Sequence, residues 1–126
     1  MIAESSGPTK MKILLILNDP PYGSERSYNA LRLAMSLSKT NPEAETAVFL
    51  MADAVFCAKR GQATPDGYYN IERMLKAVSR KGRVLLCGTC MDARGLADGD
   101  LAEGALRSSL DELTALTLEA EKVLVF

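Results

Sequence analysis

The sequence predicts an α/β fold with a largely parallel sheet, and three observations support this class. Continuous apolar runs at residues 13–17 and 46–51 are typical of strands that are buried on both faces. Residues 71–78 repeat apolar side chains with the period of an amphipathic helix. Strand and helix patterns alternate from one end of the chain to the other, which indicates parallel strands joined by crossover helices.

The first half of the chain is expected to hold two strands separated by a helix. The strand at 13–17 is followed by a loop at 18–24, where proline and glycine bar its continuation. A helix opens at Ser24 or Glu25 and runs to about Thr40, because apolar residues mark one face and Asn41-Pro42 ends it. The second strand covers residues 46–51.

The middle of the chain is expected to lead into a third strand. Asp53 caps a short helical turn at 54–58, and a polar loop follows at 60–67. The amphipathic helix begins near Ile71, and Gly82 closes it as the C′ residue. The third strand covers residues 84–86.

The C-terminal part is expected to add one helix and one strand. Three glycines between residues 91 and 108 favour a loop with at most a short helical turn. Ser109 and Glu112 form a capping box, and the helix that follows directs Leu110, Leu113, Leu116 and Ala120 inward. The strand at 123–126 is expected to join those at 13–17, 46–51 and 84–86 as a central strand of the sheet.

Length and composition indicate one globular domain. The chain has 126 residues, and we expect a single domain over 11–126 after a flexible leader at 1–10. A formal net charge of −1 and the absence of a basic cluster give no support for a nucleic-acid partner. The strongest apolar run, 13–17, is too short to cross a membrane, and the N-terminus lacks the apolar core of a signal peptide. A cytoplasmic location is therefore expected.

The chain contains three cysteines and no histidine. The absence of histidine excludes Ser-His-Asp and Cys-His catalysis and any zinc site that needs imidazole. Three cysteines cannot complete a Cys₄ zinc site, and in a cytoplasmic chain they argue against a disulfide framework. We therefore expect neither a bound metal nor structural disulfides.

Residues 87–95, with the sequence CGTCMDARG, carry the strongest chemical signal in the chain. Cys87 and Cys90 lie three residues apart after the third strand, and Arg94 follows one turn later. A thiolate is the reactive form of cysteine, and its pKa falls beside Arg, near helix N–H groups or in Cys-x-x-Cys. The alternative is that both cysteines are small buried residues of a strand-to-helix turn. For Arg94 the alternatives are contact with a thiolate or an ion pair with Asp92 or Asp98.

The loops after the first three strands, at 18–24, 53–67 and 87–95, are expected to meet at the carboxyl edge of the sheet, where α/β proteins bind ligands. Asn18, Tyr22 and Ser24 are candidates to line a small pocket there. Gly88 and Thr89 join them as candidate substrate-binding residues. Cys57 follows apolar residues on one face and is interpreted as a core residue.

Six segments in order resemble motifs of the DsrE/DsrF-like family, most closely its YchN-type branch. They are residues 18–25 (NDPPYGSE), 31–34 (LRLA), 49–55 (FLMADAV), 60–62 (RGQ), 67–71 (GYYNI) and 87–95. The resemblance extends over residues 11–126.

The resemblance implies a flavodoxin-like three-layer sandwich, assembly into homotrimers or homohexamers, and a role in sulfur handling. In sulfur-relay members a persulfide-carrying cysteine lies eight residues before the glycine of an Arg-Gly pair. The residue of this chain that matches it is Cys87, with Arg94 and Gly95 completing the pattern. Cys90 is typical of the YchN-type branch and inherits no relay role by its position.

Three functions are consistent with these residues. In the first, Cys87 accepts sulfur from a donor and passes it to an acceptor thiol, with no cofactor, because thiol chemistry supplies both nucleophile and leaving group. In the second, Cys87 and Cys90 form a thiol–disulfide switch. In the third, the protein is an oligomeric binding module in which the cysteines have no chemical role.

Overall fold

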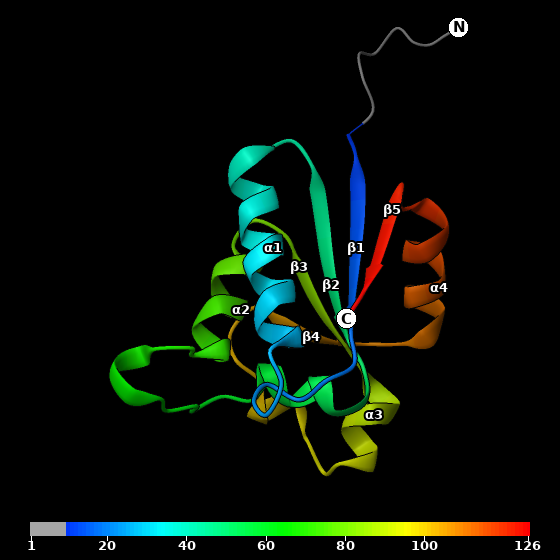
Figure 1. Ribbon diagram of the computed structural model, residues 1–126. Coiled ribbons are helices and arrows are strands. Elements are labelled where there is room, and N and C mark those ends of the chain that lie inside the picture. The colour runs from blue at the N-terminus through cyan, green and yellow to red at the C-terminus, as the bar shows by residue number, and fades with distance from the viewer. Residues whose placement is uncertain (1–9) are drawn as a thin grey trace, which may run out of the picture.

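The computed structural model describes residues 10–126, so all but the last residue of the expected leader at 1–10 lies outside the described residues. Five parallel strands form one sheet in the order β4-β3-β2-β1-β5 (Figure 1). The strands are β1 (Lys12–Leu17), β2 (Glu45–Leu50), β3 (Arg83–Cys87), β4 (Ala105–Ser108) and β5 (Lys122–Val125). The expected α/β class is confirmed.

Helices cover the two faces of the sheet unequally (Figure 1). The helices α1 (Arg26–Thr40) and α2 (Ile71–Ser79) pack on one face, and α4 (Leu110–Glu119) packs on the other. In β1, Leu15 points to the first face and Leu14 to the second, because successive side chains of a strand alternate. The result is the expected flavodoxin-like three-layer sandwich.

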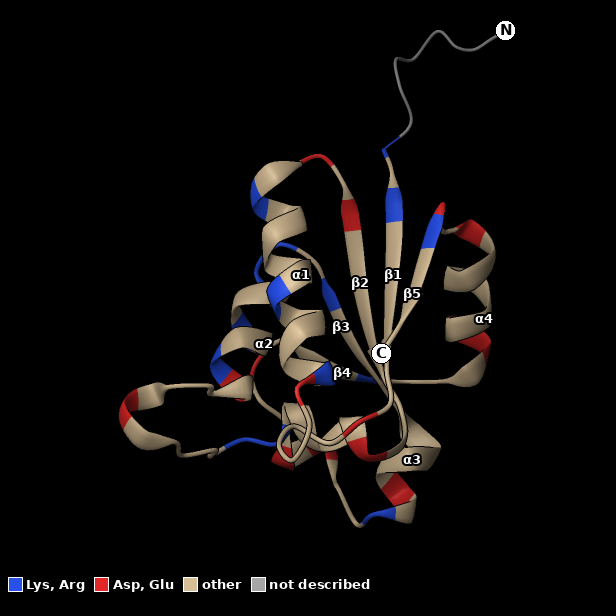
Figure 2. Ribbon diagram, in the orientation of Figure 1, with Lys and Arg blue, Asp and Glu red and all other residues tan. Residues whose placement is uncertain are grey.

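Buried apolar strands hold the sheet together, and charged residues stand at the strand starts. Leu15 of β1 lies opposite Val48 of β2, and both are fully buried. Lys12, Glu45 and Lys122 begin β1, β2 and β5, and the other residues of these three strands are uncharged (Figure 2). Such near-continuous apolar runs are typical of parallel strands covered on both faces.

The strand at 123–126 was expected to be central, but β5 lies at the edge of the sheet. The chain returns from β4 at the far edge to pair β5 with β1, which reverses the direction in which strands are added. Val125 is accordingly 66% exposed. Apolar composition alone does not distinguish such an edge strand from a central one.

The sequence interpretation missed two elements between residues 88 and 108. A short helix, α3 (Gly88–Ala93), directly follows β3, and β4 forms the opposite edge of the sheet. Strand β4 has only four residues, of which Leu106 and Arg107 are exposed. It therefore lacks the continuous apolar pattern that identified the other strands.

The ends of α2 were only partly predicted. Asn70 caps the start, because its side chain accepts a hydrogen bond of 3.0 Å from the Arg73 N–H. The expected C′ role of Gly82 is wrong, since the helix ends at Ser79 and Gly82 does not have a positive φ. Gly82 is needed for space instead: a Cβ there would lie 2.5 Å from the carbonyl oxygen of Thr46.

One of the two hydrogen bonds of the predicted capping box of α4 is confirmed. The Ser109 hydroxyl accepts a hydrogen bond of 3.2 Å from the Glu112 N–H, but the Glu112 carboxylate contacts Ser108 and Arg83 rather than returning to Ser109. Leu110 was expected to point inward and is 65% exposed. Only Leu113 of this helix is fully buried, because one helix covers little of this face.

Within residues 10–126 we find no helix that is both long and apolar enough to cross a membrane.

Replacement of Gly82 by alanine is expected to destabilise the fold by about 1–3 kcal/mol, because the new methyl group overlaps the backbone of β2. Gly99→Ala is the matched control, since a Cβ at position 99 meets no atom within 4 Å and φ there is not positive. Urea unfolding of both variants measures the difference. Equal free energies of unfolding would contradict the steric role of Gly82.

Candidate thiol site

Cys87 is both the last residue of β3 and the residue that precedes α3. It lies opposite Ser108 of β4 and faces the side of the sheet that α4 covers, where Phe49, Leu85 and Leu113 surround it. Cys87 is 7% exposed. The strand therefore brings the Cys87 thiol to the carboxyl edge of the sheet, as the sequence predicted.

Local hydrogen bonds favour the thiolate of Cys87. Burial acts to raise the pKa of this thiol. The Thr89 hydroxyl, the Cys90 thiol and the N–H groups of both residues act in the opposite direction. Their combined effect is larger, so the pKa of Cys87 is lowered. The Thr89 oxygen lies 3.1 Å from the Cys87 sulfur. With only six residues, α3 is too short for a substantial dipole, so these individual contacts account for the effect.

Cys90 is the third residue of α3 and is only partly buried. Burial and the neighbouring Cys87 raise the pKa of its thiol, while the N–H of Ala52 and the charge of Arg94 act in the opposite direction. Each thiol thus influences the pKa of the other. When one of the two loses its proton, Cys87 is the favoured thiolate.

Ala52 follows β2 with an unusual backbone conformation. Its φ is +51°, in the left-handed region that residues with a Cβ adopt at an energetic cost. Its backbone N–H acts to lower the pKa of the Cys90 thiol. Strained residues of this kind gather at functional sites, and Ala52 lies beside this one.

Arg94 does not form either of the contacts expected of it. Its side chain donates to the carboxylate of Asp53 at 2.8 Å and to the carbonyl oxygen of Cys90 at 3.2 Å. The expected ion pair with Asp92 or Asp98 is absent, because both carboxylates bind Arg107. Its charge acts on the pKa of Cys90, and Arg94 is not among the groups that shift the pKa of Cys87.

Arg107 is a residue of the site that sequence reasoning missed. It binds Asp92 at 3.0 Å and Asp98 at 2.6 Å, and it donates to the carbonyl oxygen of Gly88 at 3.2 Å. A Cβ at Gly88 would lie 2.9 Å from this guanidinium, so glycine allows the close approach. No sequence signal could have placed Arg107 here, because it lies in the unpredicted strand β4.

The three candidates of the first loop do not contact Cys87 or Cys90. Asn18 donates to the carbonyl oxygen of Phe126 through its backbone and its side chain. The Tyr22 hydroxyl donates to Gln62 at 2.6 Å, and Ser24 donates to Asp19 at 2.8 Å. Tyr22 and Ser24 instead line a pocket of about 400 Å³ beside Tyr28 of α1, and neither Cys87 nor Cys90 lines it.

Cys57 has the properties of a core residue, as expected. It is fully buried in the 3₁₀ helix Ala52–Ala58, and its thiol donates to the carbonyl oxygen of Asp19 at 3.9 Å. Burial raises the pKa of this thiol to about 12. Cys57 therefore stays protonated at neutral pH.

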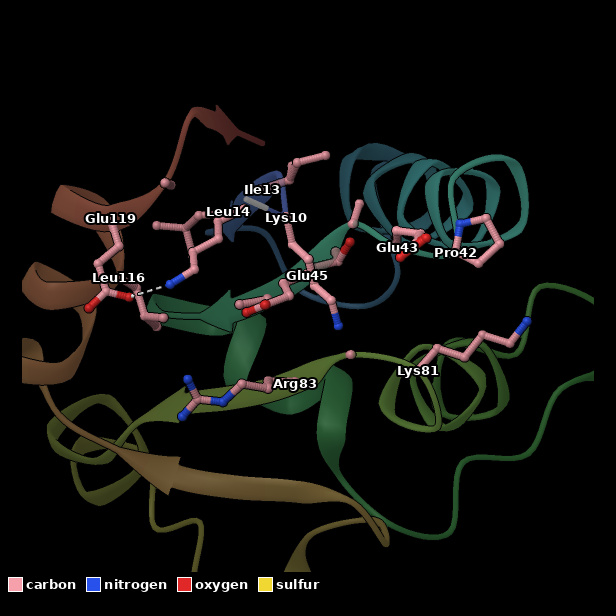
Figure 3. A pocket seen from close by; sticks show the side chains of 16 residues that line it. Lys10, Ile13, Leu14, Pro42, Glu43, Glu45, Lys81, Arg83, Leu116 and Glu119 are labelled. Atoms are coloured by element: carbon pink, nitrogen blue, oxygen red, sulfur yellow. Dashed lines mark hydrogen bonds and ion pairs between the residues drawn. The ribbon is translucent and has the colours of Figure 1, made fainter. Parts of the chain in front are cut away.

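A second pocket, of about 350 Å³, lies at the opposite end of the sheet (Figure 3). Its walls are formed by the starts of β1, β2 and β3 and by the end of α4. No cysteine lines it. Lys12 and Glu119 form an ion pair of 3.4 Å across it. Among residues 10–126, no three His, Cys, Asp or Glu side chains gather in a way that could hold a metal ion.

The sequence profile of the DsrE/DsrF-like family matches residues 11–126. The chain belongs to this family. Protein YchN of Escherichia coli K12 is 42% identical over 116 residues, which cover 91% of this chain and 98% of YchN. An uncharacterised protein of Methanocaldococcus jannaschii is 34% identical over 92% of this chain and 100% of its own length.

The fold of this DsrE/DsrF-like chain also agrees with a solved structure. The crystal structure of YchN from Escherichia coli superposes with a TM-score of 0.87 at 42% identity, covering 92% of this chain and 99% of the YchN chain. The resemblance to the family and to its YchN-type branch is therefore confirmed.

Replacement of Thr89 by valine is expected to shift alkylation of Cys87 to higher pH. The variant loses a hydroxyl contact that lowers the pKa of Cys87, so less thiolate is present at a given pH. Thr89→Ser keeps the hydroxyl and serves as the control. The measurement is the pH dependence of iodoacetamide labelling, resolved by peptide, and an unchanged profile in Thr89→Val would contradict the assignment.

Proposed function

We propose that the protein is a persulfide carrier that uses Cys87. The Cys87 thiolate attacks the outer sulfur of a donor persulfide, a bond forms between the two sulfurs, and the donor leaves as a thiolate. An acceptor thiolate later attacks the same outer sulfur and releases Cys87. Both steps exchange one sulfur–sulfur bond for another and need no cofactor.

The contacts of Cys87 are the observation that carries this proposal. The Thr89 hydroxyl and the N–H groups of Thr89 and Cys90 lower the pKa of Cys87, while the protonated Cys57 serves as an internal contrast. The same donors are positioned to bind a persulfide anion. Membership of the DsrE/DsrF-like family agrees with a role in sulfur handling.

The other candidate residues take different roles in this proposal. Arg94 is a positioning residue, because its bonds to Asp53 and to the Cys90 carbonyl hold α3 against the turn that follows β2. Gly88 permits the close approach of Arg107, and Thr89 supplies its hydroxyl. No substrate role is proposed for Asn18, Tyr22 or Ser24, whose polar groups already bind other parts of the chain.

We also propose that the carrier is a homotrimer or homohexamer whose interface includes the face of the sheet that α4 covers only in part. Leu106 pairs with Leu85, and Val125 pairs with Ile16, so both side chains lie on that face. Such exposed apolar area is typical of an interface between subunits. The exposed large apolar side chains on β4, α4 and β5 are Leu106 at 62%, Leu110 at 65%, Leu118 at 82%, Val123 at 38% and Val125 at 66%.

The position of this apolar surface suggests how the carrier protects its sulfur. Leu106 lies two residues before Ser108, which pairs with Cys87, so the surface reaches the thiol. A neighbouring subunit placed there would shield a persulfide from water. We place the protein in the cytoplasm, where reducing conditions keep thiols free for this chemistry.

A thiol–disulfide switch is the second candidate function, because Cys90 lies close enough to alter the pKa of Cys87. The two candidates differ in their need for Cys90. A carrier still binds sulfur at Cys87 after Cys90→Ser, whereas a switch loses its disulfide.

Incubation with glutathione persulfide is expected to add about 32 Da, the mass of one sulfur atom, to Cys87 of the Cys90→Ser variant. Peptide mass spectrometry locates the added sulfur. Cys57→Ala is expected to behave as the wild type, and Cys87→Ser is expected to take up no sulfur. An adduct that survives in Cys87→Ser, or that never forms in Cys90→Ser, would overturn the assignment of Cys87 as carrier.

Replacement of Leu106 by glutamate is expected to dissociate the oligomer, because it places a charge in the proposed apolar interface. Lys39→Glu is the control, since Lys39 is exposed in the last turn of α1 on the opposite side of the sheet. Light scattering coupled to size exclusion measures the molar mass of each. A wild type that is monomeric at micromolar concentration would rule out the oligomer.

A further inference from the structure

Cys87 and Cys90 are arranged so that one thiol can act on a sulfur bound to the other. Cys87 is the N-cap residue of α3 and Cys90 is its third residue. An N-cap side chain reaches the backbone of the third helical residue, and the N–H of Cys90 does lower the pKa of Cys87. Residues three apart are neighbours on a helical turn, and a disulfide needs Cα atoms within about 7 Å.

Cys90 also has surroundings of its own that suit a nucleophile. It is partly exposed, the N–H of Ala52 points toward its sulfur, and Arg94 donates to its carbonyl oxygen. A partly exposed thiol with a dedicated hydrogen-bond donor is more than a packing residue.

The state of Cys87 influences the pKa of Cys90. Burial raises the pKa of the Cys90 thiol, and in the free protein Cys87 raises it further. Transfer of sulfur to Cys87 moves the negative charge from its Sγ to the more distant outer sulfur, so this effect weakens while those of Ala52 and Arg94 remain. A larger fraction of Cys90 is then thiolate, the nucleophilic form, after Cys87 has received sulfur.

We infer that the protein has a second activity, the reductive release of sulfide from its own persulfide. This inference rests on the proposed carrier function of Cys87. The Cys90 thiolate attacks the inner sulfur, which is the Cys87 Sγ, and a Cys87–Cys90 disulfide forms. The bond from the Cys87 Sγ to the outer sulfur breaks, and its electron pair leaves with the outer sulfur as hydrosulfide.

The step is balanced without another oxidant. The two cysteine sulfurs lose two electrons in total, and the outer sulfur gains them as it becomes sulfide. A dithiol reductant then reduces the disulfide by thiol–disulfide exchange and restores both thiols. The site thus has two outcomes: transfer when an acceptor thiol reaches the outer sulfur first, and sulfide release when Cys90 reacts first.

The experiment is a single loading of fully reduced protein with glutathione persulfide, followed by rapid removal of the donor. Sulfide is measured with monobromobimane, and the protein is measured by intact mass over time. The wild type is expected to release about one sulfide per loaded chain and to end about 2 Da lighter than the reduced protein, the mass of two hydrogens lost in a disulfide. Cys90→Ser is expected to keep its added 32 Da and to release at least tenfold less sulfide.

The controls separate this inference from the function on which it rests. Cys57→Ala is expected to match the wild type in both readouts, because Cys57 is buried and protonated. A wild type that keeps its added sulfur on Cys87 and releases no sulfide would overturn the inference and leave the carrier function standing. If neither the wild type nor Cys90→Ser takes up sulfur at Cys87, the carrier function fails, and the inference fails with it. The wild-type time course decides the question even if Cys90→Ser does not fold.

Discussion

The parallel pairing of β2 with β3 is the interaction on which the thiol site depends. Leu50 lies opposite Leu86, so the two strands end side by side, and the residues that follow them meet at the carboxyl edge of the sheet. Cys87 ends β3, while the turn after β2 brings the Ala52 N–H to Cys90 and the Asp53 carboxylate to Arg94. A shift of one residue in this register would move Cys87 to the other face of the sheet.

The thiolate of Cys87 is favoured by local hydrogen bonds rather than by a nearby cation. Arg94 and Arg107 both lie beside α3, but carboxylates pair with each of them. These ion pairs are partly exposed, and such pairs contribute at most about 1 kcal/mol each. Their main effect is geometric, because they attach α3 to the turn after β2 on one side and to β4 on the other. The Thr89 hydroxyl and the backbone N–H groups are therefore the groups that stabilise the Cys87 thiolate.

The unequal cover of the two sheet faces connects the fold to the proposed assembly. Helices α1 and α2 bury one face, and α4 alone cannot bury five strands on the other. Cys87 lies on this thinner side, next to the exposed Leu106. A subunit interface there would complete the apolar core and enclose the sulfur site in one arrangement.

The sequence by itself determined the class of fold and the residues that carry thiol chemistry. Buried apolar runs identified β1, β2 and β3, the helical period identified α2, and spacing singled out Cys87 and Cys90, because these signals are local. Only the tertiary structure decided that Arg94 binds Asp53, that Arg107 joins the site and that Tyr22 and Ser24 line a separate pocket. These facts depend on which strands are neighbours and on which face each side chain lies, and the pairing of distant segments fixes both.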